Sequence, residues 1–154
     1  MTHVFLATGD LAMDREDYDE SFVATRDLLQ SADMVFGQLE TSFANKGSRM
    51  PQARHAVLAR PEGAAALARA GFDIISMAGN HCMDWGQEAF FETRGHLEAA
   101  GIAVVGAGAN IAEARAPVIR TLGDGTRVAV LAYSSILPQD YWATERRPGC
   151  APMR

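Results

Sequence analysis

Short apolar runs alternate with longer amphipathic segments along this chain, which is the pattern of an α/β protein. The predicted strands cover residues 3–8, 34–39, 55–58, 73–77 and 102–105, and the predicted helices cover residues 17–31, 61–71 and 87–100. Pro61 stands in the preferred first turn of its helix, and Gly71 and Gly101 follow helices as C-terminal glycines. The order of these elements predicts repeated βαβ units.

An antiparallel hairpin is predicted near the end of the chain. Residues 117–122 and 127–133 are strand-like, and Gly123-Asp124-Gly125 between them provides an Asp-Gly turn. We therefore expect a mixed β-sheet flanked by helices. The 154 residues are 48% hydrophobic and contain no linker, so they predict one domain, residues 1–154. Because residues 146–154 are polar and Pro-rich, we expect the domain to continue beyond residue 154.

Charge and cysteine content narrow the function classes. The formal net charge of -5 is spread along the chain and no basic patch occurs, which argues against nucleic acid as a partner. The two cysteines, Cys82 and Cys150, are far apart and form no CxxC pair, so neither a disulfide framework nor a zinc knuckle is expected. No signal peptide precedes the first strand, so a cytoplasmic location is the default expectation.

Polar side chains follow three of the predicted strands. Asp10 follows the first strand, Glu40 the second, and Asn80 and His81 the strand at residues 73–77. Ligands in open α/β sheets gather at the carboxyl ends of strands, and divalent cations need carboxylates, amides and imidazoles from several elements. These four residues are therefore candidate metal ligands, and Asp84 is a candidate for orienting His81.

Each candidate also has a structural interpretation when it is taken alone. Asp10 and Asp84 are common helix-capping residues, Asn80 is a common turn residue, and a single histidine such as His81 is often only hydrogen-bonded within the fold. Glu40 is equally compatible with a solvated loop. The combination of all of them at strand ends favours the site.

Other residues receive a structural interpretation. His55 and His96 are predicted to lie away from the motif ends, with packing or surface roles. Cys82 is next to His81 but has no base beside it, so it is interpreted as a small buried side chain rather than a nucleophile. Ile111 replaces the third glycine after Gly106-x-Gly108, so no dinucleotide cofactor is expected.

The motif Ala-Gly-Asn-His-x-x-Asp-x-Gly at residues 78–86 resembles the CapA family of poly-γ-glutamate capsule biosynthesis proteins. Gly9-Asp10, Leu39-Glu40-Thr41 and the segment 70–73 are also similar to that family, and the likeness extends over most of the chain. Because CapA is similar to the calcineurin-like metallophosphoesterases, the resemblance implies their layered fold.

The resemblance also implies functions for individual residues. Asp10 and Glu40 would be metal-binding carboxylates, Asn80 a metal-bridging or phosphate-binding amide, and His81 a general acid or oxyanion stabiliser. The cofactor would be one or more divalent ions, such as Mn²⁺, Zn²⁺, Fe²⁺ or Mg²⁺. Ala12 stands where metallophosphoesterases usually have a further histidine, and no histidine follows His96.

Two functions are therefore expected. The first is a metal-dependent hydrolase acting on a phosphoester or on a γ-linked amide of a polyanionic polymer, for which His81 and Asn80 would be catalytic. The second is a non-catalytic component that holds a capsule polymer or joins a membrane capsule-synthesis complex, with cell-envelope association. Asn80 and His81 favour the first function, whereas Ala12 favours the second.

Overall fold

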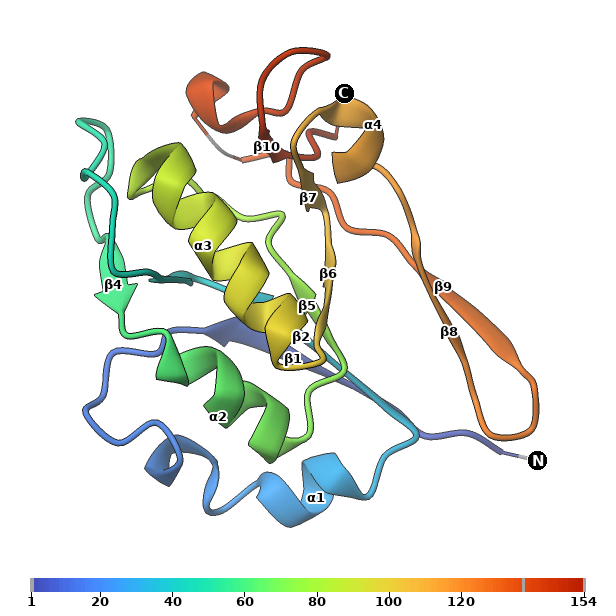
Figure 1. The fold of residues 1–154 in the computed structure, drawn as a ribbon. Coiled ribbons are helices and arrows are strands. Elements are labelled where there is room, and N and C mark those ends of the chain that lie inside the picture. The colour runs from blue at the N-terminus through green and yellow to red at the C-terminus, as the bar shows by residue number, and fades with distance from the viewer. Residues whose placement is uncertain (1, 137, 154) are drawn as a thin grey trace.

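A four-stranded parallel sheet forms the centre of the molecule, as a computed structural model describing residues 2–136 and 138–153 shows (Figure 1). The strands follow the order β1-β2-β5-β6. Their bounds are Phe5–Leu11 for β1, Met34–Leu39 for β2, Ile74–Ser76 for β5 and Ala103–Val105 for β6. The α/β class predicted from the sequence is thus confirmed, with a parallel central sheet.

Three helices cover one face of this sheet, as Figure 1 shows. They are α1 (Arg26–Gln30), α2 (Glu62–Ala70) and α3 (Gly86–Ala99). Val35 of β2 and Ile75 of β5 point to this face and join Leu67 and Leu97 in the main core. Gly71 ends α2 in a left-handed conformation with φ of 108°, which a glycine adopts without steric cost.

The opposite face is covered by a hairpin of β8 (Val118–Thr121) and β9 (Arg127–Val130). Met34 and Ile74, which alternate with the residues of the first face, pack with Val118 and Val128 of the hairpin. The hairpin was predicted correctly, but it forms its own two-stranded sheet. The expectation that it joins the central sheet as a mixed sheet is wrong, because it packs across the face instead of pairing at an edge.

The first predicted helix is also different in the structure. Residues 17–31 form a 3₁₀ turn, η1 (Glu20–Phe22), and only then the short helix α1. Asp17 Oδ1 accepts hydrogen bonds from the backbone N–H of Asp19 (3.0 Å) and Glu20 (3.3 Å), which closes a local turn there. The β-branched residues Val23 and Thr25 separate the two pieces and have low helix propensity.

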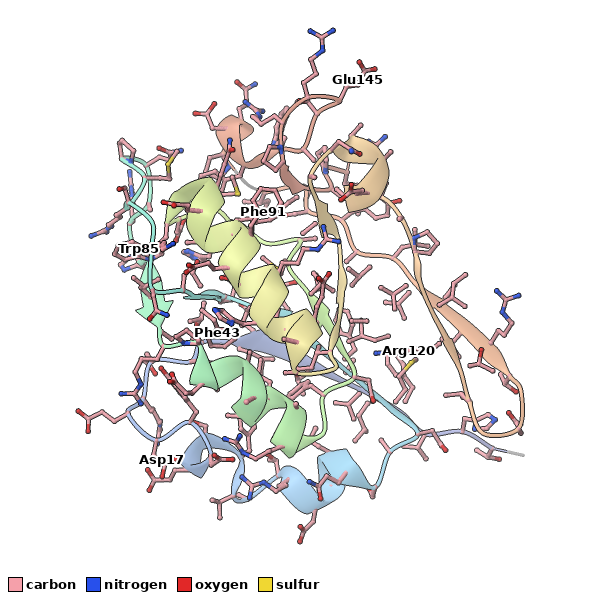
Figure 2. The ribbon with its side chains drawn as sticks, viewed as in Figure 1. Asp17, Phe43, Trp85, Phe91, Arg120 and Glu145 are labelled. Atoms are coloured by element: carbon pink, nitrogen blue, oxygen red, sulfur yellow. A yellow bond between two sulfur atoms is a disulfide. The ribbon has the colours of Figure 1, made fainter. Side chains whose placement is uncertain are left out.

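The loop after β2 contains a small parallel pair, β3 (Thr41–Phe43) and β4 (Val57–Ala59). β4 corresponds to the predicted strand at residues 55–58, and β3 was not predicted. Phe43 of β3 is fully buried near α2 and α3 (Figure 2), and its backbone N–H donates to Thr93 Oγ1 of α3 at 2.9 Å. This bond fixes β3 to α3, immediately before the loop formed by residues 44–56.

The C-terminal segment folds back over the N-terminal end of α3 (Figure 1). Its strand β10 (Gly149–Cys150) pairs antiparallel with β7 (Ala107–Gly108). The remaining short elements of the described chain are α4 (Ile111–Ala114) and η2 (Gln139–Tyr141). This return places η2 next to the loop that follows β5.

The two cysteines are joined in the structure as a Cys82–Cys150 disulfide, although 68 residues separate them. Both are buried. The expectation of no disulfide, with Cys82 as an unpaired buried side chain, is therefore wrong. Spacing along the chain carried no sign of the pair, because the return of β10 alone brings Cys150 to the loop after β5.

Within residues 2–136 and 138–153, no helix combines the length and the apolar character needed to cross a membrane.

Candidate functional site

The predicted site residues lie at the carboxyl ends of the parallel strands of the central sheet. In the parallel register, Asp10 of β1 is paired with Gln38 of β2, and Gln38 is paired with Ser76 of β5. Glu40 follows β2 directly, and its backbone N–H donates to the carbonyl of Leu11 at 3.1 Å. The carboxyl ends of three adjacent strands therefore meet at the positions from which Asp10, Glu40 and the loop after β5 extend.

Glu40 is the more enclosed of the two candidate carboxylates. Its side chain is 14% exposed, and Gln38 Nε2 donates to its Oε1 at 3.2 Å. Burial raises the pKa of Glu40; the Gln38 hydrogen bond and His81 lower it, while the negative charges of Asp10 and Asp84 raise it further. Asp10 itself is exposed. The site thus concentrates negative charge around a partly desolvated carboxylate.

His81 is held by a buried carboxylate. Its Nδ1 lies 2.6 Å from Oδ2 of Asp84, whose side chain is only 4% exposed. Since an ionised carboxylate accepts hydrogen bonds only, Nδ1 carries the hydrogen and donates it. This bond orients the ring so that Nε2 faces Glu40 Oε2 at 3.7 Å. Asp84 therefore binds His81 and does not cap α3. The N-cap residue of α3 is Trp85, and no side chain makes a capping hydrogen bond there.

Tyr141 completes this arrangement and was missed in the sequence. Its hydroxyl donates to Asp84 Oδ1 at 2.8 Å, so both oxygens of that carboxylate are engaged. Burial and the adjacent Asp84 raise the pKa of Tyr141. The two residues are 57 positions apart, and no local motif marks Tyr141. The nearest signal was its place in a polar segment that also contains an aromatic pair, Tyr141-Trp142.

A cavity of about 250 Å³ opens beside His81. Asn80, His81 and Asp84 line one side of it, and the other lining residues are Gln52, Ala53, Arg54, His55, Pro138 and Tyr141. The expectation that His55 lies away from the motif ends is therefore wrong, because the loop at residues 44–56 folds over the site. Asp10 and Glu40 are not among the described lining residues. His81 lines the cavity and also faces Glu40, so it lies between the cavity and the carboxyl ends of the strands.

The donor set has the chemistry of a divalent-cation site. Asp10, Glu40, Asn80 and His81 offer carboxylate, amide and imidazole atoms, the ligand types that Mg²⁺, Mn²⁺, Fe²⁺ and Zn²⁺ accept. A cation would offset the charge gathered at Glu40, where two further carboxylates act on its pKa. Across the described residues, however, no group of three His, Cys, Asp or Glu side chains is placed so that it could hold a metal ion, and a cation here would need Asn80 or other ligands as well.

Comparison with known proteins assigns the chain to a family. The family model for the bacterial capsule synthesis protein PGA_cap matches residues 4–154. A probable polyglutamine synthesis accessory protein of Mycobacterium tuberculosis is 31% identical over 122 residues, or 77% of this chain and 32% of that protein.

Two relatives from Bacillus have related descriptions. The PGA biosynthesis protein CapA of Bacillus subtilis is 22% identical over 94% of this chain and 40% of its own length. The capsule biosynthesis protein CapA of Bacillus anthracis is 30% identical over 62% of this chain and 23% of its own. The chain spans less than half the length of these curated relatives. By the match over residues 4–154, the chain belongs to the bacterial capsule synthesis protein family PGA_cap.

Proposed function

We propose that this chain carries part of the active site of a metal-dependent hydrolase with a metallophosphoesterase-like fold. Its substrate would be a phosphoester or a γ-linked amide of an acidic capsule polymer, a context suggested by the names of the Bacillus relatives. The observation that supports this most is the orientation of His81. Its Nδ1 is fixed by the buried Asp84, and its Nε2 is turned toward Glu40.

In the proposed reaction, water bonds to the phosphorus or carbonyl carbon and releases a proton to solvent, while the bond to the leaving oxygen or nitrogen breaks. His81, protonated at Nε2, donates that proton to the leaving group, and Asp84 stabilises the resulting ring orientation. Asp10 and Glu40, with Asn80, would hold a divalent cation. When bound, such a cation polarises the scissile group and lowers the pKa of water. In the alternative role of its amide, Asn80, which is exposed beside His81, would bind an oxygen of the substrate instead of the cation.

A second function, polymer binding without catalysis, is supported by Ala12. This residue stands two positions after Asp10, where metallophosphoesterases usually have a histidine, and it offers no ligand atom. In this alternative the same cavity beside His81 holds a polymer segment for a capsule-synthesis complex at the cell envelope. The two functions differ in turnover rather than in binding.

The two functions are tested with the complete protein. Hydrolysis of bis-p-nitrophenyl phosphate and of a γ-linked glutamate oligomer would be measured with and without Mn²⁺, together with bound metal by mass spectrometry. Glu40→Gln is expected to lower metal content and His81→Asn to lower turnover at least 100-fold. The matched control Asp27→Asn removes an exposed carboxylate on α1.

The outcomes separate the alternatives. Metal-dependent turnover that is lost in Glu40→Gln and His81→Asn but kept in Asp27→Asn supports the hydrolase. Oligomer binding with no turnover under any metal supports the non-catalytic function and would reject the hydrolase.

A further inference from the structure

One wall of the site cavity is built by the loop of residues 44–56, and this wall is held firmly in place. The backbone N–H of Met50 donates to the carbonyl of Asp84 at 2.8 Å, and that of Ser48 donates to the carbonyl of Trp85 at 3.2 Å. Trp85 lies beside this loop in Figure 2. The loop is therefore attached to the same segment that orients His81.

Arg49 fixes the far end of the wall. Its guanidinium donates to the carbonyls of Ala53 at 2.9 Å and Arg54 at 2.8 Å. The guanidinium of Arg49 is thus hydrogen-bonded to the backbone of its own loop. The positions of Arg54 and His55 at the cavity follow from these bonds, and the wall does not depend on a ligand for its shape.

The side chains of Arg54 and His55 make no hydrogen bond or ion pair within the described fold. Both line the cavity and both are exposed. Neither the guanidinium of Arg54 nor the imidazole of His55 has a hydrogen-bond or ion-pair partner among the described residues. Among the described lining residues, Arg54 carries the one permanent positive charge. By contrast, Arg147 nearby is paired with Asp140 at 3.6 Å.

On the opposite side of the cavity, no described residue forms an ion pair with Arg54. Asp84 is the acidic residue of the lining, and its two oxygens are occupied by His81 and Tyr141. Glu40 and Asp10 lie beyond His81, at the carboxyl ends of the strands. A guanidinium with five donors that faces a cavity and has no partner is suited to a carboxylate or phosphate oxygen pair.

We propose that Arg54 and His55 form an oxyanion subsite that holds a carboxylate of an acidic γ-linked glutamate chain next to His81. Arg54 supplies the charge, His55 supplies a further N–H donor, and the cleavable bond would lie between this subsite and the carboxyl ends of the strands. The subsite selects the substrate by its charge. The choice of polymer rests on the proposed function, whereas the anion binding rests on the cavity alone.

The test is a binding measurement on the complete protein. Fluorescence anisotropy of a labelled γ-linked glutamate decamer would be read within seconds of mixing, before turnover can consume it. Arg54→Ala is expected to raise the dissociation constant about tenfold or more, as for the loss of a charged hydrogen-bonded pair. Arg54→Lys should retain part of the affinity, and His55→Ala should raise the constant about threefold.

Controls separate charge at the cavity from charge on the protein as a whole. Arg127→Ala removes an exposed arginine of β9, on the distant hairpin, and should leave the dissociation constant unchanged. Because Arg54 is exposed and its side chain is unpaired, Arg54→Ala should unfold at the wild-type temperature. A γ-linked glutamine decamer, which has the same backbone without the charges, should bind at least tenfold more weakly.

Several results would overturn the subsite. They are equal affinity of Arg54→Ala and wild type, equal affinity for the glutamine and glutamate decamers, or no decamer binding at all. Binding of inorganic phosphate that depends on Arg54, without decamer binding, would assign the subsite to a phosphoester and reject the carboxylate. The proposed hydrolase fails independently, since a decamer bound through Arg54 but never cleaved leaves the subsite intact.

Discussion

Gly79 lies where the loop after β5 passes Gln38 and Glu40. A methyl group at this position would stand 2.5 Å from Gln38 Nε2 and 2.9 Å from Glu40 Oε1. Since both atoms end flexible side chains, we expect Gly79→Ala to displace Glu40 without unfolding the protein. In the complete protein, the affinity for Mn²⁺ should fall about 10–100-fold, while the free energy of unfolding changes by less than about 1 kcal/mol.

Gly9→Ala is the matched control for this substitution. Gly9 precedes Asp10 on β1, and a methyl group there would meet no atom within 4 Å. Metal affinity measured by calorimetry should therefore stay at the wild-type value. Equal affinities of Gly79→Ala and wild type would contradict the placement of Glu40 in a metal site.

Tyr141 provides a prediction about stability. Tyr141→Phe removes the donor to Asp84 Oδ1 in a buried setting. An unsatisfied buried acceptor costs about 1–3 kcal/mol, so urea denaturation should show a loss of that size. Tyr133→Phe removes a hydroxyl from a tyrosine that is 37% exposed and should change the free energy of unfolding by less than about 0.5 kcal/mol. Similar losses in the two variants would mean that the Asp84 bond contributes nothing.

At the scale of elements, His3 connects the start of β1 to the hairpin turn. His3 Nε2 lies 2.9 Å from Asp124 Oδ2, and hydrogen bonding to Asp124 raises the pKa of His3. The same turn, through hydrogen bonds from Thr126 and then His3, lowers the pKa of Asp124 to about 2. The contact therefore stabilises the fold below pH 6.5 and is lost as pH rises through the raised pKa of His3; at acid pH it is lost as pH falls through the lowered pKa of Asp124, about 2.

An NMR titration of the His3 ring checks this contact. The midpoint should lie above 6.5 in the wild type and should return toward 6.5 in Asp124→Asn. Asp14→Asn, which removes an exposed carboxylate elsewhere, should leave the midpoint unchanged. A wild-type midpoint at or below 6.5 would show that His3 is not bonded to Asp124.

The elements that the sequence predicted well are those with local signals. β2 was predicted with its exact bounds, and α2 lies between Pro61 and Gly71 as expected. The Asp-Gly turn marked the hairpin. In contrast, β3, β7 and β10 have two or three residues each, and they exist only because a partner strand lies beside them. No periodicity can be read from so few residues.

The same distinction applies to the site. The residues at strand ends, Asp10, Glu40 and His81, could be named because parallel strands bring their carboxyl ends to one edge. Tyr141 and His55 could not, since a returning C-terminal segment and a folded-over loop place them. Ligand roles for the strand-end residues stay predictions until metal binding is measured.

For the whole molecule, the Cys82–Cys150 disulfide joins the loop after β5 to the returning β10. Crosslinks of this kind stabilise chiefly by restricting the unfolded chain and are typically worth about 2–4 kcal/mol. We expect dithiothreitol to lower the free energy of unfolding in urea by about that amount. The double variant Cys82→Ala and Cys150→Ala should be insensitive to the reductant. Alkylation of two thiols in the denatured, unreduced wild type would contradict the link.

β1 is one of the two edge strands of the central sheet, and its first residue Phe5 and the preceding Val4 are about half exposed, at 50% and 48%. Its outer row of backbone N–H and C=O groups can template another strand. Asp10 belongs to this same strand. A strand that adds to β1 would therefore run alongside Asp10, so that pairing with a neighbour would also change the surroundings of this candidate site residue.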